Sequence, residues 1–135
     1  MIVGNERAFL TWFYDRHTIN KGAITRGTID EYLRTFSGRE GVLGSMGIYR
    51  AAFQSIEQTE RLTQSKVQTP VMAMGGVKGL GPRVGAMVRM VAANVEEIVL
   101  ADSGHFVPGE RPDAIVNEIL ALSKQLSRTK LPTAV

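Results

Sequence analysis

The sequence predicts an α/β chain in which a helical segment precedes a β-α-β-α unit. Two observations predict the unit: Val71–Met74 and Ile98–Ala101 are short apolar runs ending in small residues, and apolar residues at helical spacing separate them. The third observation is that apolar residues in the first part of the chain recur at helical intervals. We expect a helical segment over 1–66, a β-α-β-α portion over 67–127 and a tail over 128–135.

The first part of the helical segment is expected to form two short helices. An aromatic cluster in residues 8–14 predicts a short, deeply packed helix, and residues 18–26 are expected to form a connection. Thr28 followed by Glu31 has the spacing of a capping box, in which each side chain satisfies a free amide of the first turn. A second helix is therefore expected to begin at Thr28 and to end near Gly38.

A third and longer helix is expected from Glu40 to about Gln64. Its apolar residues recur at intervals of four, three, four and three, and so predict one buried stripe: Val42, Met46, Tyr49, Phe53 and Ile56. Gly44 and Gly47 weaken this helix, each by roughly 1 kcal/mol relative to alanine.

The β-α-β-α unit begins after Pro70. Val71–Met74 is continuously apolar, as in a strand covered on both faces, and the glycine-rich residues 75–81 lead into a helix marked by Val84, Met87, Val88 and Val91. The last helix is expected to start near Pro112, because a missing N–H costs nothing in the first turn, and to bury Ile115, Ile119, Leu122 and Leu126. Two short parallel strands leave both edges open, so more strands must come from elsewhere or from a second copy.

Composition limits the classes of function. With 44% hydrophobic residues in 135, the chain can form one modest core, and its net charge of +3 is scattered rather than gathered in the basic stripe that nucleic-acid binding needs. The absence of cysteine excludes disulfides, thiolate zinc sites and cysteine nucleophiles. No apolar stretch approaches the ~20 residues of a membrane span, and the first residues do not resemble a signal peptide. We expect a cytoplasmic protein with no nucleic-acid or membrane partner.

His105 is the candidate catalytic residue. It follows the second expected strand, and open parallel sheets hold their chemistry at the carboxyl ends of their strands. We expect its imidazole to project from the rim of the sheet toward a cleft roofed by the helical segment. An imidazole titrates near neutral pH and can take a proton from water or from a nucleophile, which favours a general base. The alternative is a loop histidine packed against Phe106.

The residues around His105 resemble a known family. Ser103–Pro108, with Glu110-Arg111-Pro112 and a helix behind it, resembles the histidine loop of α/β-hydrolase-fold enzymes, in particular the epoxide hydrolase and haloacid or haloalkane dehalogenase branch. Residues 70–76 resemble the penultimate core strand of that fold, and residues 48–53 resemble the Tyr-Arg segment of its helical cap. The resemblance implies the carboxyl-terminal portion of such an enzyme: a helical cap segment, then the last β-α-β-α of the core, with an incomplete parallel sheet.

The resemblance also implies a mechanism. An aspartate attacks the substrate carbon to form an ester, cap tyrosines hydrogen-bond the opening epoxide oxygen, and the histidine activates water against the ester. His105 takes the histidine's place, and Tyr49, Trp12 and Phe106 are the candidate substrate-binding residues. The implied substrate is a small epoxide, haloacid or ester, with no cofactor. No Gly-x-Ser-x-Gly or Gly-x-Asp-x-x-Gly turn occurs in the sequence, so the nucleophile is expected from a missing amino-terminal half or another chain.

Two roles stay open at the level of sequence. No Asp or Glu occurs between Gly75 and Val95 to orient the histidine, and Asp102, three residues before His105, is expected only to close the strand. Tyr49 lies on an apolar stripe, where an aromatic side chain belongs either to the core or, as the resemblance implies, to the substrate pocket.

Two alternative functions remain. Gly79-Leu80-Gly81 and Asp102 outline a dinucleotide-binding βαβ unit, but Val84 stands where the third glycine should be and Pro82 removes an amide donor. The other alternative is a non-catalytic remnant or assembly module, which would oligomerise to cover its sheet edges. No metal site is expected, because the histidines and carboxylates share no ligand spacing.

Overall fold

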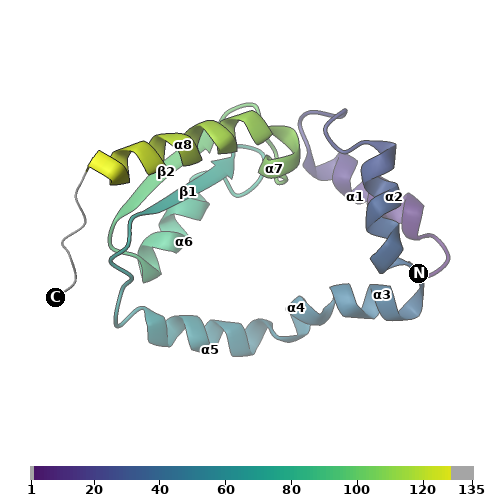
Figure 1. Ribbon diagram of the computed structural model, residues 1–135. Coiled ribbons are helices and arrows are strands. Elements are labelled where there is room, and N and C mark those ends of the chain that lie inside the picture. The colour runs from purple at the N-terminus through teal and green to yellow at the C-terminus, as the bar shows by residue number, and fades with distance from the viewer. Residues whose placement is uncertain (1, 129–135) are drawn as a thin grey trace.

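The computed structural model describes residues 2–128 as ten elements in a helical half and a sheet half (Figure 1). In chain order they are α1 (Glu6–His17), α2 (Arg26–Phe36), α3 (Gly38–Ser45), α4 (Gly47–Arg50), α5 (Ala52–Leu62), β1 (Val71–Gly76), α6 (Arg83–Val91), β2 (Val95–Leu100), α7 (Val107–Glu110) and α8 (Pro112–Arg128). The expected tail lies outside the described residues apart from Arg128. Among the described helices, none combines the length and apolar character needed to cross a bilayer.

The sheet half confirms the predicted β-α-β-α order. Strands β1 and β2 pair in parallel, from Val71 opposite Val95 to Gly76 opposite Leu100. Helix α6 connects them and packs against both strands, while α8 lies over the other face of the pair (Figure 1). This is the fold class expected from the sequence, with two described strands of an incomplete parallel sheet.

Strand β2 begins three residues earlier than the apolar run predicted. Glu96 and Glu97 interrupt the apolar pattern near the start of the strand, so the sequence predicted a later start. Glu97 is accommodated because its carboxylate pairs with the guanidinium of Arg89 on α6 at 2.5 Å. A strand residue that faces a helix can therefore be charged when the helix supplies its counter-ion.

The predicted capping box of the second helix was wrong by one turn. The N-cap of α2 is Thr25, whose Oγ1 accepts a hydrogen bond from the N–H of Thr28 at 3.1 Å. Thr28 therefore lies inside the helix, and its own hydroxyl is 3.0 Å from that of Thr25. Thr25 is followed three residues later by Thr28 and not by the Glu or Gln of a capping box, so the box pattern indicated the later threonine although the earlier one begins the helix.

The single helix expected over 40–64 is three helices, α3, α4 and α5, interrupted at Met46 and Ala51. At the first interruption the carbonyl of Leu43 accepts a hydrogen bond from the guanidinium of Arg50 at 2.7 Å, so a side chain replaces the lost helical donor. These helices form a row that joins the α1–α2 pair to the sheet half (Figure 1). The predicted buried stripe was also wrong: Val42 is buried, but Phe53 is 82% exposed.

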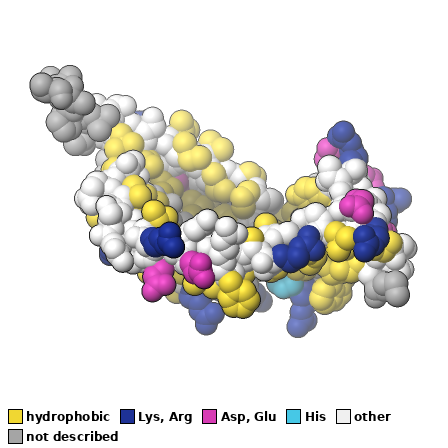
Figure 2. Space-filling view, turned by 90° about the horizontal axis from the view of Figure 1, so that it is seen from below, with side chains coloured by type: hydrophobic (Ala, Val, Ile, Leu, Met, Phe, Trp, Pro, Cys, Tyr) yellow, Lys and Arg dark blue, Asp and Glu magenta, His cyan; other side chains and the backbone are white. Residues whose placement is uncertain are grey.

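The core is small for the apolar content of the chain. The buried apolar side chains are few and divided between the two halves: Leu10, Ile29, Val42, Ala73, Ala92 and Val107. On α8 the expected buried stripe is wrong as well, because Ile119 is 57% exposed and Ile115, Leu122 and Leu126 are only half-buried. Apolar side chains lie exposed between charged ones on both halves of the molecule (Figure 2). Much apolar surface is thus left for another segment or chain to cover.

Candidate active site

The loop after β2 carries His105 at the carboxyl ends of the two strands, as predicted. Its backbone is fixed from two sides. The N–H of Lys78, in the turn after β1, donates to the carbonyl of Ser103 at 3.3 Å, and the N–H of His105 donates to the carbonyl of His17 at 2.8 Å. The short helix α7 follows at once and was not predicted. The histidine loop therefore lies between the end of β1 and the end of α1.

Two glycines allow this close approach. A Cβ on Gly104 would collide with the carbonyl oxygen of His17 and lie 2.9 Å from the carboxylate of Glu110. A Cβ on Gly79 would lie 2.8 Å from the Cα of His105. Both positions need a residue without a side chain because backbone meets backbone there. Packing against the histidine loop thus explains the glycine at position 79, in the turn after β1.

The His105 imidazole lies beside the helical half. Its ring centroid is 6.3 Å from that of His17 and 5.0 Å from that of Phe106, which it meets at 90°. The Nδ1 of His17 is 2.7 Å from the carbonyl oxygen of Phe13. The His105 side chain is exposed, whereas the sequence interpretation expected it to face a cleft roofed by the helical segment. The juxtaposition with α1 is present, but the roof is not formed by the described residues.

Aromatic rings continue from the histidine loop into the helical half. The ring of Phe106 lies 4.5 Å from that of Tyr14 and 5.8 Å from that of Phe13, and Tyr14 lies 5.3 Å from Tyr32. Loss of solvent raises the pKa of Tyr14, and its interaction with Tyr32 raises that pKa further. The Tyr14 phenol therefore stays neutral, and able to donate a hydrogen bond, to a higher pH than an ordinary tyrosine.

An apolar hollow of about 690 Å³ adjoins this aromatic cluster, and Phe13 and Tyr14 form part of its wall. Its walls come from α1 to α4 and from the residues around them: Ile2, Phe9, Leu10, Phe13, Tyr14, Phe36, Ser45, Met46, Ile48 and Tyr49. Tyr49 is 66% exposed, so its interpretation as a core aromatic was wrong. Trp12 is 57% exposed with its ring 6.3 Å from that of Phe9, and it is not among the residues lining the hollow. Of the predicted substrate-binding residues, Tyr49 borders the hollow and Phe106 contacts its wall.

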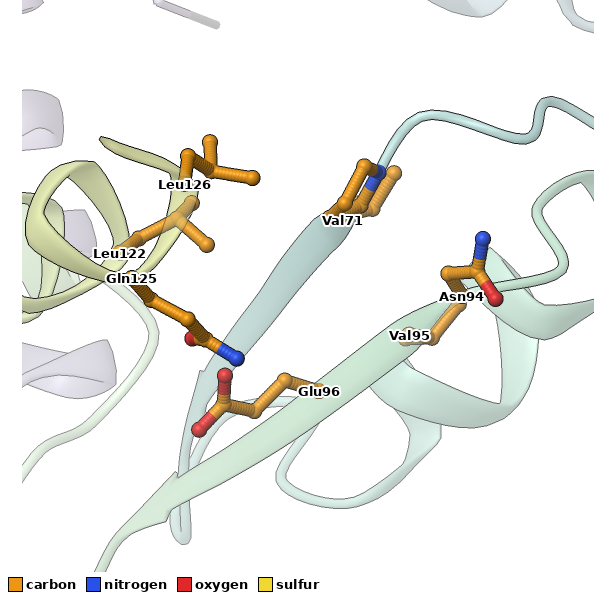
Figure 3. Close-up of a pocket in the computed structure, with 8 residues that line it drawn as sticks. Val71, Asn94, Val95, Glu96, Leu122, Gln125 and Leu126 are labelled. Atoms are coloured by element: carbon orange, nitrogen blue, oxygen red, sulfur yellow. The ribbon is translucent and has the colours of Figure 1, made fainter. Parts of the chain in front are cut away.

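A second hollow, of about 370 Å³, lies at the opposite end of the sheet (Figure 3). It is lined by Val71 and Val95, the first residues of β1 and β2, and by Leu122 and Leu126 of α8. Glu96 and Gln125 point toward one another from its two walls (Figure 3). Because parallel sheets place their chemistry at the carboxyl ends of the strands, this hollow is not the candidate active site.

Asp102 does not serve His105. Its carboxylate pairs with the guanidinium of Arg111, which also binds Asp113 at 2.9 Å. This arrangement raises the pKa of Arg111, and the hydrogen bond from Arg111 lowers the pKa of Asp113. The acid nearest to His105 in the sequence thus fixes the start of α8. Within residues 2–128, no three His, Asp or Glu side chains are grouped as metal ligands.

Glu110 is the residue that sequence reasoning missed. It is 4% exposed, and its carboxylate accepts hydrogen bonds from the backbone N–H groups of Gly104, Ile19 and Asn20 at 2.9, 2.6 and 3.1 Å. Its position in the sequence, two residues before an expected helix, is typical of a solvent-exposed charge. No spacing rule predicts that a loop 90 residues earlier supplies its donors.

Comparisons with known proteins agree with this geometry. The sequence is 31% identical over 116 residues to a soluble epoxide hydrolase of Corynebacterium sp. (strain C12), in a match that covers 84% of this chain and 39% of that protein. The solved structure of Cfl2 from Burkholderia cenocepacia is 33% identical, with a TM-score of 0.81 over 90% of this chain and 42% of its own. The epoxide hydrolase CorEH is 27% identical, with a TM-score of 0.79 over 93% of this chain and 44% of its own. No family model matches the chain.

These likenesses define the class of protein. The chain has the fold of part of an α/β-hydrolase core with its helical segment, and it corresponds to the carboxyl-terminal portion of an epoxide-hydrolase-like α/β hydrolase. It spans 39% to 44% of the length of the proteins named here. The predicted resemblance and the predicted fold class are both confirmed.

Proposed function

We propose that this chain supplies the histidine and the cap segment of an epoxide-hydrolase-like active site. His105 is the general base that activates water against an ester intermediate, and the nucleophile comes from polypeptide outside these 135 residues. Residues 1–66 act as the cap segment and 67–127 as the core portion. The observation that carries the proposal is that the helical half meets His105 at the carboxyl end of a parallel strand pair.

The proposed chemistry has two steps. In the first, a carboxylate oxygen bonds to an epoxide carbon, the carbon–oxygen bond of the ring breaks, and the released oxygen takes a proton from a phenol. In the second, His105 accepts a proton from water as the water oxygen attacks the ester carbonyl, and the ester carbon–oxygen bond breaks. The departing oxygen takes the proton of the newly formed carboxylic acid, which releases the diol and restores the carboxylate, and the imidazolium returns its proton through solvent to the phenolate. Tyr49 is the proposed phenol, and Phe106 and Trp12 are proposed apolar contacts to the substrate.

The apolar hollow supports a small apolar epoxide as the substrate class. Its lining is almost entirely hydrocarbon and aromatic, with Tyr49 at its border. Such a surface binds an apolar epoxide by hydrophobic contact and offers little to a charged haloacid. Two of the relatives named above are epoxide hydrolases by name, which favours the same class.

The exposure of His105 is expected if other polypeptide completes the site. Strands β1 and β2 alone leave open edges, and apolar side chains of α5 and α8 face solvent. An amino-terminal half that adds strands beside β1 would bring the nucleophile to the same edge as His105. A second copy of the chain could cover the apolar surface but would bring no nucleophile turn.

The proposal is tested in a fusion. The part of the Corynebacterium soluble epoxide hydrolase outside the matched region is placed before this chain, and hydrolysis of a small aryl epoxide is followed. We expect turnover by the fusion, loss of turnover in His105→Ala, and retention of turnover in the control Glu57→Gln, at an exposed position of α5. Turnover that survives His105→Ala at the unmodified rate would contradict the proposed role.

A non-catalytic assembly module is the second candidate function. It is favoured by a specific observation, the apolar side chains of Val116, Ile119 and Leu120 that stay exposed on one helix. If the chain is an assembly module, the fusion will be inactive while the chain still associates with itself or with a complementary half.

A further inference from the structure

Glu110 lies where the helical half and the sheet half of the molecule meet. Its side chain is buried, and it reaches from α7 to two separate loops. Oε1 accepts the N–H of Gly104, the residue directly before His105. Oε2 accepts the N–H groups of Ile19 and Asn20, in the connection between α1 and α2. One carboxylate therefore joins the histidine loop to the cap segment.

Glu110 has the surroundings that a buried carboxylate needs. A carboxylate removed from water is tolerated only when hydrogen-bond donors replace the water, and here three backbone amides do so. The bond from Ile19 is short, at 2.6 Å, as charge-assisted hydrogen bonds are. The dependence is mutual, because without the carboxylate the amide of Gly104 would be a buried donor with no acceptor.

Together with a backbone hydrogen bond of His105, the same contacts form a closed ring of hydrogen bonds around the backbone of His105. The N–H of His105 donates to the carbonyl of His17, and the N–H groups two and three positions after His17 donate to Glu110. The opposite side of the ring is Gly104, whose N–H returns to Glu110. Moving the histidine loop relative to α1 would break at least one bond of this ring.

We propose that Glu110 is a positioning residue, which fixes the backbone of His105 against the α1–α2 connection and so sets where the imidazole stands relative to the cap segment. The consequence for catalysis rests on the proposed function of His105. Glu110 itself touches no reacting atom in this role.

The first test is local and needs no activity. Amide hydrogen exchange and the ring resonances of the two histidines are measured by NMR in the 135-residue chain, in Glu110→Gln and in Glu110→Ala. Glu57→Gln, at an exposed position of α5, is the matched control. Glutamine keeps the volume of the side chain, but it offers one acceptor oxygen instead of two and places an N–H₂ group against a backbone donor.

In Glu110→Gln we expect protection at Gly104, or at Ile19 and Asn20, to fall by about tenfold or more. The ring resonances of His105 shift, while the amides of β1 and all signals of Glu57→Gln stay as in the unmodified chain. Unchanged protection and unchanged His105 resonances would overturn the proposal. A uniform fall that includes β1, or unfolding, would also overturn it, because Glu110 would then stabilise the whole fold rather than position one loop.

The second test uses the epoxide-hydrolysing fusion. Glu110→Gln should lower kcat and KM together by about tenfold and leave kcat/KM close to that of the unmodified fusion, because slowing only the water step makes the ester accumulate and does not change the steps that form it. A fall in kcat/KM with KM unchanged or raised would overturn the positioning role. If the unmodified fusion is inactive, the proposed function fails, and the NMR result alone decides the role of Glu110.

Discussion

The imidazole rings of His17 and His105 lie 6.3 Å apart and meet at 64°, although 88 positions separate them in the sequence. The contact joins the end of the first helix to the loop after the last strand. It is supported on the backbone by the bond from His105 N–H to the His17 carbonyl and by the Glu110 carboxylate behind it. The helical half and the sheet half are therefore held together at the candidate active site.

The chain alone should not hydrolyse epoxides or esters. The sequence holds no turn that would present a nucleophile, and the His105 side chain is open to solvent. We expect rates equal to buffer for small aryl epoxides and for nitrophenyl esters, measured over several hours. Turnover by the isolated chain that His105→Ala abolishes would show that a nucleophile is present after all.

The isolated chain should associate with itself. Exposed apolar side chains on α8, together with open strand edges, leave a surface that favours burial against a second copy. Sedimentation should show a concentration-dependent dimer or larger species, and Ile119→Lys should shift it toward the monomer. A stable monomer at every concentration tested would count against this expectation.

Replacing Gly104 with alanine should destabilise the fold. The new Cβ would meet the backbone of His17, which cannot move without breaking the joint between the halves, and such overpacking typically costs about 1–3 kcal/mol. Gly44→Ala is the matched control, because that glycine lies in α3 with nothing within 4 Å of an added Cβ. The control should be neutral or gain up to about 1 kcal/mol. Urea unfolding distinguishes the two, and equal stability of both variants would refute the close-packing argument.

Acid should weaken the start of α8 through Asp113. Arg111 lowers the pKa of this carboxyl group, so its contribution to stability is present above the ordinary carboxyl pKa of about 3.9 and is lost as the pH falls through the lower folded value. Asp113→Asn should remove that part of the pH dependence while leaving the rest. The urea midpoint of both proteins, followed from neutral to strongly acidic pH, is the measurement. The two curves should converge in acid, and parallel curves throughout would exclude the Arg111–Asp113 pair as the cause.

The sequence predicted the parts of the fold that local patterns govern. Continuous apolar runs predicted both strands, and because a helix connects them they had to be parallel, as they are. The position of His105 after the second strand followed from the same reasoning. The order of strands and helices decides which loops lie at the carboxyl edge of a sheet. Short sequence patterns predict that order, and so they predicted the place of His105.

The failures came where tertiary contacts outweigh local patterns. The helix over 40–64 was expected from periodicity, yet it is interrupted where the Arg50 side chain supplies the donor for Leu43. The stripes on α5 and α8 were expected to be buried, but the described residues provide nothing to cover them. Glu110 was missed because its donors come from the other end of the chain.

The most direct measurement of the central claim is the intact mass of the fusion protein during reaction with an aryl epoxide. If His105 activates the water that hydrolyses the ester, His105→Ala will form the ester and stop there, so the protein mass will rise by that of one epoxide and stay raised. The unmodified fusion will show the added mass only transiently. If His105→Ala shows no added mass, or loses it as fast as the unmodified fusion does, then His105 is not the base of the second step.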